Sequence, residues 1–318
     1  MSTDYLIISP CRDESDYMER TLDSIVKQTL LPKKWVIVDD GSTDSTPQIL
    51  ETYSRQYDFI EVITRENRGF RQVGPGVIDA FYTGYLEAEP ESFDYVCKLD
   101  LDLDLPERYF EILIHRMEES LRIATCSGKP YNEIRGRMVS EKRGDEMSVG
   151  MTKLYRRTAF EQIGGFIREV MWDAIDCHRC RQLGWLAYSW DEPELRFNHL
   201  RMMGSSQQNI LVGRMRHGYG QYFMGTGLIY MTATSTFRAM QRPYLIGGLA
   251  MLWGYLQSIL KNSPRLDDKD LQKFIRRFQW DCLLHGKKEA TRKYDKLYAD
   301  NWSLARLPLE MPLNPKTR

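Results

Sequence analysis

Short apolar runs alternate with segments of helical periodicity through the first half of this 318-residue chain. Such alternation is typical of a largely parallel sheet whose strands are connected by covering helices. We therefore expect an α/β fold with a mostly parallel sheet and helices on both faces. The expected strands span residues 5–9, 35–38, 60–64 and 95–99, and the expected helices span about 15–28 and 75–87, with two more that begin near Thr46 and Pro106.

Shorter elements fill the middle of the chain, from residue 151 to residue 198. They include a strand near 153–156, a helix at about 173–183 that Gly184 stops, and strands near 186–190 and 195–199. We expect a sheet-containing domain over residues 1–225. A C-terminal helical extension, with the character of a membrane-associating segment, is expected over residues 226–318.

The charges are balanced overall, with 44 Lys and Arg against 44 Asp and Glu. This balance argues against a nucleic-acid-binding protein, which needs a basic excess to displace counterions from phosphates. The distribution is nevertheless uneven, because the segment from Lys261 to the end has 14 Lys and Arg but only 8 Asp and Glu. A basic tail behind a mildly acidic body fits contact with anionic lipid.

The start of the chain has neither a basic region nor a long apolar stretch, so a signal peptide is not expected. The six cysteines follow no regular spacing framework, which fits a reducing compartment. Residues 177–180 read C-H-R-C, but no second pair lies at a zinc-binding spacing, so buried cysteines are favoured over a metal or redox site. We expect a cytoplasmic protein at the inner face of the cell membrane.

Residues 243–260 form an 18-residue stretch without charge. As a helix it would be roughly 27 Å long, which is marginal for crossing a bilayer. Glycines and polar residues dilute its hydrophobicity, while arginines and lysines flank it. Three interpretations stay open: a buried helix or oligomer contact, an interfacial or re-entrant helix, and a membrane span.

Carboxylates cluster at the ends of expected strands, which is where an open α/β sheet presents its ligand crevice. One cluster is Asp39-Asp40. The other contains Asp100, Asp102 and Asp104, which would share one face of an extended chain. Packing like charges together is unfavourable unless a cation neutralises them, and oxygen ligands favour Mg²⁺ or Mn²⁺.

In these motifs the chain resembles the family 2 glycosyltransferases of the GT-A fold. Residues 6–14 read L-I-I-S-P-C-R-D-E, similar to the family's opening strand and Pro-x-x-Asn-Glu turn, with Asp13 where Asn is usual. Residues 35–44 read W-V-I-V-D-D-G-S-T-D and match its V-D-D-G-S-x-D signature, and 67–71 resemble its N-x-G turn. Asp100-Leu101-Asp102 stands at the place of its D-x-D motif. Gly164-Gly165-Phe166 followed by Trp172-Asp173 and Gly184 reproduces its G-G-F…E-D…G spacing, with Trp172 replacing the usual Glu.

The resemblance implies a role for each matching residue. Asp173 would be the general base, and His199 would join Asp100 and Asp102 around a Mg²⁺ or Mn²⁺ ion on the donor diphosphate. Asp40 would accept a hydrogen bond from the base of the nucleotide, and Arg214 and Arg216 would close over the diphosphate. The residues expected to contact the nucleotide are Pro10, Arg12, Glu14, Asp40, Arg71 and Asp100.

Some of these residues have simpler interpretations. Asp39 and Asp40 could cap a helix, and His199 could be an ordinary residue at a strand end. Asp104 is more plausibly solvated, or at a helix start, than a third metal ligand. Asp176 is either a charge on a helix surface, which we slightly favour, or a second carboxylate near the base.

The sequence thus predicts an inverting, metal-dependent glycosyltransferase that moves a sugar from a UDP-, GDP- or dTDP-sugar to a hydroxyl of a glycan or lipid-linked glycan, in the synthesis of cell-surface glycans. A homo-oligomer is compatible with it. Two rivals stay open: a catalytically inactive sugar-nucleotide-binding or scaffold protein, because Trp172 departs from Glu, and a nucleotidyltransferase. The second usually has a glycine-rich loop after its first strand, whereas residues 10–14 contain no glycine.

Overall fold

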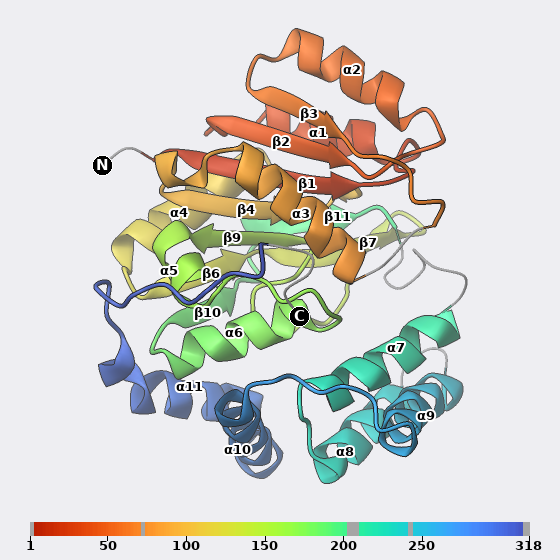
Figure 1. Cartoon of the computed structure of the whole chain (residues 1–318), viewed down its shortest axis with the longest axis vertical. Helices are drawn as coiled ribbons and strands as arrows, with labels where there is room; N and C mark the ends of the chain where they lie inside the picture. The colour runs from red at the N-terminus through yellow and green to blue at the C-terminus, as the bar shows by residue number, and fades with distance from the viewer. Residues whose placement is uncertain (1–2, 71–73, 202–209, 241–243, 314–318) are drawn as a thin grey trace.

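The computed structural model (Figure 1) describes residues 3–70, 74–201, 210–240 and 244–313. In this part of the chain, seven strands form the central sheet in the order β10-β6-β9-β4-β1-β2-β3. Neighbouring strands are parallel except β9, which is antiparallel to β4 and β6. The mostly parallel sheet is therefore confirmed. Its strands are β1 (Tyr5–Cys11), β2 (Lys34–Asp39), β3 (Ile60–Thr64), β4 (Tyr95–Leu99), β6 (Ile123–Ser127), β9 (Thr152–Arg156) and β10 (Leu186–Ser189).

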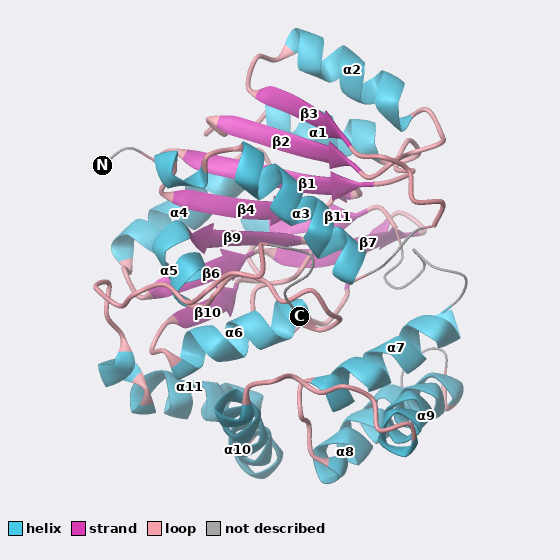
Figure 2. Ribbon diagram, in the orientation of Figure 1, coloured by secondary structure: helices cyan, strands magenta, loops and turns pink. Residues whose placement is uncertain are grey.

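Helices cover both faces of this sheet (Figure 2). Successive strand residues point to opposite faces, so Ile7 joins a core with the first set of helices while Ile8 joins a core with the second. Two hydrophobic layers thus enclose the sheet, as the alternating pattern predicted. The first set is α1 (Met18–Val26), α2 (Thr46–Gln56) and α4 (Tyr109–Glu119), and the second is α3 (Pro75–Glu87), α5 (Arg157–Gln162) and α6 (Trp172–Gln182).

A smaller sheet, of which only β11 was expected, has the order β5-β11-β7-β8. Its strands are β5 (Leu103–Asp104), β7 (Lys129–Ile134), β8 (Arg137–Ser140) and β11 (Arg196–His199). β11 is antiparallel to β5, so His199 pairs with Leu103. The backbone N–H of Leu200 also donates to the carbonyl of Asp102 over 2.8 Å. This pairing brings the end of β11 to the D-x-D segment.

Helices make up the C-terminal part of the described chain. They are α7 (Ile210–Phe223), α8 (Leu228–Ala239), α9 (Ile246–Leu260), α10 (Lys269–His285) and α11 (Lys287–Leu297). α7 belongs to the expected first domain by sequence, yet it packs along α9 of the expected extension (Figure 1). The boundary at residue 225 therefore stays a prediction about folding units.

Glycines allow α9 to pack closely on its neighbours. A Cβ added at Gly254 would lie 2.1 Å from the carbonyl oxygen of Met215 on α7, and one added at Gly248 would lie 2.4 Å from that of Ser235 on α8. The residues that dilute the hydrophobicity of 243–260 are thus positions of backbone contact. The opposite side of α9 exposes Leu249, Trp253 and Leu260.

No helix in the described ranges combines the length and the apolar character that a bilayer crossing requires. Of the three interpretations of 243–260, the span thus finds no support in these ranges. Packing on α7 and α8 buries one side of α9, while its exposed apolar side keeps the interfacial interpretation open.

The last described residues return to the central sheet, and in Figure 1 this segment passes in front of β6 and β9. The side-chain amide of Gln162 donates to the carbonyls of Ser303 and Leu304 over 3.0 and 3.2 Å. Arg168 donates to the carbonyl of Leu313 over 3.0 Å. The segment is thereby tied to α5 and to the loop that leads into α6.

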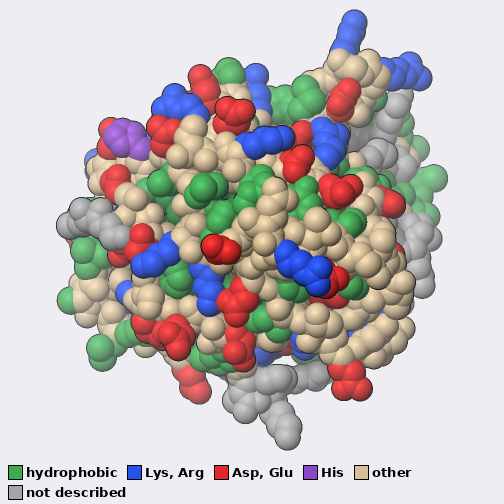
Figure 3. Space-filling view, turned by 90° about the horizontal axis from the view of Figure 1, so that it is seen from above, with side chains coloured by type: hydrophobic (Ala, Val, Ile, Leu, Met, Phe, Trp, Pro, Cys, Tyr) green, Lys and Arg blue, Asp and Glu red, His purple; other side chains and the backbone are tan. Residues whose placement is uncertain are grey.

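Acidic and basic side chains are intermingled on the face of the molecule seen in Figure 3. Uncharged and apolar side chains separate them there. This mixture fits the balanced charge of the whole chain.

Candidate active site

A cavity of about 370 Å³ opens at the carboxyl ends of β1, β2 and β4. Each expected site residue that the structure describes lines it. Arg71 is the exception among the expected residues, since it lies outside the described ranges. The lining residues that the sequence predicted are Pro10, Arg12, Glu14, Asp40, Asp100, Asp102, Asp173, His199, Arg214 and Arg216.

The two neighbouring aspartates at the end of β2 have different environments. Oδ1 of Asp39 accepts hydrogen bonds from the backbone N–H and the hydroxyl of Ser42, over 2.9 and 2.6 Å, and so holds the turn after the strand. Gly41 in this turn has φ +76°, and a Cβ there would lie 2.5 Å from the Cα of Asn67. Only glycine fits such a close approach. Asp39 is thus structural, whereas Asp40 lines the cavity.

Arginines surround the carboxylate of Asp40. Arg65 lies 2.9 Å away from one oxygen, and Arg68 forms an ion pair with the other. Burial raises the pKa of Asp40, although Arg65, Arg68 and Arg12 pull it down. Arg12 also donates to the backbone carbonyl of Asp40 over 2.8 Å. At the β2 end of the cavity, arginines therefore hold the carboxylate of Asp40 in a fixed position.

The departure at position 13 has a backbone explanation. Asp13 has φ 51°, in the left-handed region that Asn and Asp tolerate better than most residues. Its carboxylate accepts a hydrogen bond from the N–H of Thr43 over 2.7 Å, and the next N–H, of Glu14, donates to the hydroxyl of Thr46 over 2.9 Å. Asp13 thus serves the turn as Asn would, and leaves Glu14 facing the cavity.

Asp100 is paired with a lysine that the sequence analysis did not assign to the site. Lys98 is 2% exposed, forms an ion pair with Asp100 and donates to the carbonyl of Gly150 over 3.1 Å. Desolvation raises the pKa of Asp100 against the pull of Lys98, and the neighbouring Asp102 raises it further. One side of the acidic pair is therefore neutralised from within the protein.

Asp102 lies between the imidazole of His199 and the guanidinium of Arg201. Nε2 of His199 and Nε of Arg201 are each 3.7 Å from Oδ2 of Asp102. Burial alone would raise the pKa of Asp102, but His199 and Arg201 outweigh it and lower it. Nδ1 of His199 lies 2.6 Å from Glu141, which fixes the ring, and Arg201 also forms an ion pair with Glu14.

The acidic pair suits a cation that is shared with a substrate. Oδ1 of Asp102 is buried and has no hydrogen-bond partner in the described part of the chain. The carboxylate of Asp100 is 34% exposed towards the cavity. Across the described ranges, no three His, Cys, Asp or Glu side chains form a ready ligand set. Mg²⁺ commonly takes only one or two carboxylates together with substrate phosphates, so these residues fit such an ion.

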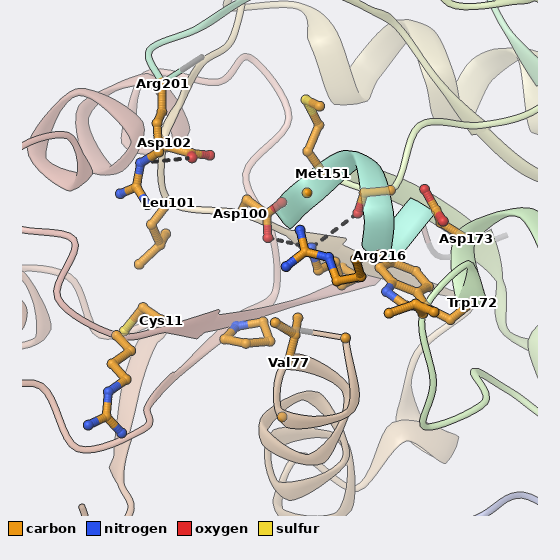
Figure 4. A pocket seen from close by; sticks show the side chains of 18 of the residues that line it. Cys11, Val77, Asp100, Leu101, Asp102, Met151, Trp172, Asp173, Arg201 and Arg216 are labelled. Atoms are coloured by element: carbon orange, nitrogen blue, oxygen red, sulfur yellow. Dashed lines mark hydrogen bonds and ion pairs between the residues drawn. The ribbon is translucent and has the colours of Figure 1, made fainter. Parts of the chain in front are cut away.

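Asp173 lies in the first turn of α6, on the opposite side of the cavity from Asp102 and Arg201 in the view of Figure 4. Asp100 and Arg216 appear between them in that view. The carboxylate of Asp173 packs against Gly150, the residue whose carbonyl accepts a hydrogen bond from Lys98. The acidic pair and Asp173 thus line one cavity, and Gly150 contacts both Asp173 and Lys98, the partner of Asp100.

The favoured interpretation of Asp176 as a charge on the surface of α6 was wrong, because this residue is 3% exposed. Its carboxylate is 2.5 Å from Nζ of Lys153 and accepts a hydrogen bond from the hydroxyl of Tyr155. Lys153 also donates to the backbone carbonyl of Asp173 over 2.8 Å. The buried ion pair therefore anchors the first turn of α6, where Asp173 lies.

Asp104 and the C-H-R-C segment both lie outside the chemistry of the cavity. Asp104 is partly exposed and pairs with Arg20 over 2.6 Å, away from the cavity, as the simpler interpretation held. Cys177 and Cys180 are completely buried, and burial raises the pKa of both thiols. They are packing residues of α6.

The sequence analysis missed several residues of the cavity wall. Lys98 lies two positions before Asp100, so strand alternation already placed it on the same face. Arg201 lies two positions after His199, and the same signal was available. Arg143 and His217 carried no such local signal, because the cavity collects them from separate elements.

Comparison with known proteins gives a family match. The model of the family described as "Glycosyl transferase family 2" matches residues 6–172. The chain is also 29% identical over 120 residues to the poly-beta-1,6-N-acetyl-D-glucosamine synthase of Staphylococcus aureus strain MSSA476 and 27% identical over 120 residues to that of Staphylococcus epidermidis. These matches cover 38% of this chain, which spans 27% of the length of each synthase.

Two solved structures have similar folds. TarS 1–349 of S. aureus in complex with UDP-GlcNAc has a TM-score of 0.50 at 16% identity, covering 93% of this chain and 90% of that chain. GalNAc-T7 with UDP, GalNAc and Mn²⁺ has a TM-score of 0.53 at 14% identity, covering 89% of this chain and 58% of that chain. The likeness confirms the expected GT-A fold.

Proposed function

Because the chain belongs to glycosyl transferase family 2, we propose that this glycosyltransferase moves a sugar from a nucleotide-sugar to an acceptor hydroxyl in one inverting displacement. The observation that carries the proposal is a single cavity lined by Asp40, by the Asp100 and Asp102 pair and by Asp173. A donor and an acceptor that react directly need such a shared space.

Asp173 is the proposed general base. Its carboxylate takes the proton from the acceptor hydroxyl as that oxygen attacks the anomeric carbon of the donor sugar. The attack comes from the side opposite to the leaving nucleoside diphosphate, so the configuration inverts. Lys153 and Gly150 support this role, since they contact the backbone and the side chain of Asp173.

The nucleotide is proposed to bind at the β1 and β2 end of the cavity. Asp40 accepts a hydrogen bond from an N–H of the base, with Arg12 fixing the backbone of Asp40 from behind. Pro10, Glu14 and Asp100 line the same cavity. The sequence resemblance adds Arg71 to these contacts.

A divalent cation, Mg²⁺ or Mn²⁺, is proposed to bind the pair of Asp100 and Asp102 together with the donor diphosphate, with His199 as the further ligand that the sequence resemblance implies. When bound, the ion supplies stabilisation of the negative charge on the leaving diphosphate. The buried, unpartnered Oδ1 of Asp102 supports this assignment, and so does the ring of His199, which Glu141 holds in place. Arg216 of α7 is the cation proposed near these phosphates, and Arg214, which the sequence resemblance also implied there, lines the same cavity.

The acceptor is proposed to be a lipid-linked glycan in the synthesis of a surface polysaccharide, at the cytoplasmic face of the membrane. Two observations support this choice. The exposed apolar side chains of α8 and α9 suit the boundary of a membrane, and the staphylococcal relatives are named as synthases of a polymer. The cysteines in the described ranges are all free and buried, as in a reducing compartment.

The test compares Asp173→Asn with the unchanged protein in a transfer assay. A panel of UDP-, GDP- and dTDP-sugars, with and without Mn²⁺, is first screened for a rise in thermal stability, because a ligand that binds only the folded form stabilises it. UDP-N-acetylglucosamine is the first donor to try. We expect Asp173→Asn to lose about 100-fold to 10,000-fold in turnover while it binds the same donor.

Asp104→Asn is the matched control, since Asp104 lies outside the cavity. Unchanged turnover in Asp173→Asn would remove Asp173 from the mechanism. A parent protein that binds a donor but turns over none of the panel would favour the inactive sugar-nucleotide-binding protein, which the Trp172 replacement also fits.

A further inference from the structure

A cluster of basic side chains lies around the wall of the cavity near Asp173. Arg143 follows β8, Arg214 and His217 belong to α7, and all three line the cavity. Arg238 of α8 completes the cluster and is half-buried. We call Arg143, Arg214, His217 and Arg238 the basic cluster.

The three arginines of the basic cluster repel one another, and burial together with their charges keeps His217 neutral. Burial lowers the pKa of Arg238 to about 10, with Arg214 and Arg143 adding to the effect. Burial, followed by the three arginines, lowers the pKa of His217 to about 4, while Asp173 opposes this shift. Arg143, Arg214 and His217 line the same cavity as Asp173, and Arg238 and Asp173 both act on the pKa of His217. Like charges gathered in a cavity are favourable once an anion lies between them.

Arg214 is the member of the basic cluster whose surroundings best suit an anionic ligand. It forms no ion pair with a carboxylate among the described residues, and its buried Nε has no hydrogen-bond partner there. Burial and the neighbouring Arg143 lower its pKa. A phosphate accepts hydrogen bonds from a guanidinium in a bidentate manner, so it would satisfy this group.

Arg216 points to a different side of α7. Residues two positions apart lie nearly opposite on a helix, whereas Arg214 and His217, three apart, share a face. In agreement, burial alone accounts for the lowered pKa of Arg216, without a contribution from the cluster. The two arginines of α7 therefore serve two regions of the cavity, and the basic cluster is the one near Asp173.

The helix that contributes Arg238 also has an apolar outer groove. Leu228, Ile229, Phe237 and Met240 line this groove and are between 52% and 64% exposed. Phe237 is the immediate neighbour of Arg238, so one helix joins the cluster inside to apolar surface outside. A ligand with an anionic head and a long apolar chain complements both.

We propose that the basic cluster binds the phosphate or diphosphate of a polyprenyl-linked acceptor, whose apolar chain lies along the groove of α8. This inference rests on the proposed function, because it names the acceptor of that transfer. Arg214 then contacts the acceptor phosphate, and Arg216 is the cation of α7 that remains for the donor. The acceptor sugar follows the phosphate and brings its hydroxyl to Asp173.

Calorimetric titration of the full chain with farnesyl diphosphate, inorganic pyrophosphate and farnesol tests the proposal. EDTA is present, so that no divalent ion bridges a diphosphate to Asp100 and Asp102. We expect farnesyl diphosphate to bind about tenfold or more tightly than pyrophosphate, and farnesol to bind more weakly than either. Arg214→Gln and Arg238→Gln should each lower the affinity for farnesyl diphosphate by about tenfold or more. Phe237→Ser should lower the affinity for farnesyl diphosphate but leave the affinity for pyrophosphate unchanged.

Arg292→Gln is the matched control, because Arg292 is exposed on α11. Binding of UDP with Mn²⁺, measured separately, should be within about twofold of the parent in every variant, as should the thermal midpoint. Equal binding of farnesyl diphosphate by parent and arginine variants would overturn the site. Equal affinity for pyrophosphate and farnesyl diphosphate would overturn the lipid occupant. Loss of UDP binding in Arg214→Gln and Arg238→Gln would reassign the cluster to the donor and overturn the proposal.

The same measurements separate this inference from the proposed function. If the protein binds farnesyl diphosphate through the basic cluster but binds no sugar nucleotide, the result would contradict the proposed glycosyl transfer and support the anion site. If the protein transfers sugar to another acceptor and does not bind farnesyl diphosphate, the result would support the proposed glycosyl transfer and contradict the acceptor-phosphate site.

Discussion

The carboxylate of Asp173 packs directly on the α-carbon of Gly150, so that a Cβ built at position 150 would lie 2.7 Å from Oδ2 of Asp173. We predict that Gly150→Ala displaces this carboxylate and lowers turnover by on the order of 100-fold, the cost of a misplacement of about 1 Å. A steady-state transfer assay measures the effect. Donor affinity should change little, because Gly150 contacts the side of the cavity at Asp173.

Gly227→Ala is the control for this substitution. Nothing lies within 4 Å of a Cβ added at Gly227, and its φ of −73° is accessible to any residue. We expect full activity from this variant. Turnover in Gly150→Ala that matches Gly227→Ala would show that the contact with Asp173 does not hold the base in place.

Removal of divalent metal should abolish transfer. Asp102 lines the cavity and its Oδ1 is buried without a hydrogen-bond partner among the described residues, so we expect Asp102→Asn to raise the Mn²⁺ concentration needed for half-maximal activity. EDTA treatment followed by titration with Mn²⁺ and Mg²⁺ measures this for parent and variant. Full activity of the parent in excess EDTA would argue that Lys98 and Arg201 neutralise the acidic pair without an ion.

The buried pair of Lys153 and Asp176 should be important for stability. Lys153 is 0% exposed and Asp176 is 3% exposed, and removing one partner leaves an uncompensated charge. We predict that Asp176→Leu lowers the free energy of unfolding by about 3–5 kcal/mol, as measured by chemical denaturation. Adding Lys153→Met should recover most of this loss, because the remaining charge is removed.

The same double variant separates stability from positioning. If Lys153 orients Asp173 through its backbone carbonyl, Lys153→Met/Asp176→Leu should be stable but slow, with a lowered kcat and a nearly unchanged KM for the donor. A stable double variant with parental kcat would limit the pair to a structural role.

His178 should make the protein less stable in mild acid. It is 2% exposed against Phe278 and Phe274, and burial, followed by Arg181 and Lys287, lowers its pKa to about 3. Between pH 6.5 and about 3 the unfolded chain therefore binds a proton that the folded protein does not, so the free energy of unfolding falls as the pH falls.

Denaturation of the parent and of His178→Gln at several pH values measures this contribution. The variant should lose less stability on acidification, by a few kcal/mol over this interval. Equal slopes in the two proteins would show that His178 is protonated in the folded state.

The apolar side of α9 should contact lipid. Leu249 and Trp253 are 64% and 52% exposed, so we expect Leu249→Gln/Trp253→Gln to reduce flotation with vesicles that contain anionic lipid. Leu121→Gln, at a leucine that is 48% exposed outside the helical region, should float like the parent. Equal flotation of all three proteins would remove α9 from the membrane contact.

The sequence predicted correctly those helices and strands that are marked by a local pattern of apolar residues. The strands 60–64 and 95–99 and the helix 75–87 have the expected bounds, because apolar periodicity and flanking breakers define them. β7 and β8 were not expected, since Ile134, Met138 and Val139 are exposed and no inward alternation marks the strands.

Long-range contacts explain what the sequence could not show about the site. The motifs named Asp173, Asp100 and Asp102, and the cavity contains all three. The burial of Asp176 depends on Lys153, which lies 23 positions earlier on β9. A charge on a helix meets such a partner only after the sheet has formed, so helical spacing alone gave the wrong environment.

The returning C-terminal segment determines how the polypeptide can be divided. Ser303 and Leu313 accept hydrogen bonds from Gln162 and Arg168, and the ring of Trp302 packs edge-on against that of Trp185 at 5.9 Å. A gene cut after codon 225 would therefore express a fragment whose apolar surface under the C-terminal segment is exposed to solvent. Such a fragment is prone to aggregation. Co-expression of residues 226–318 as a separate polypeptide should cover this surface and keep the fragment from aggregating.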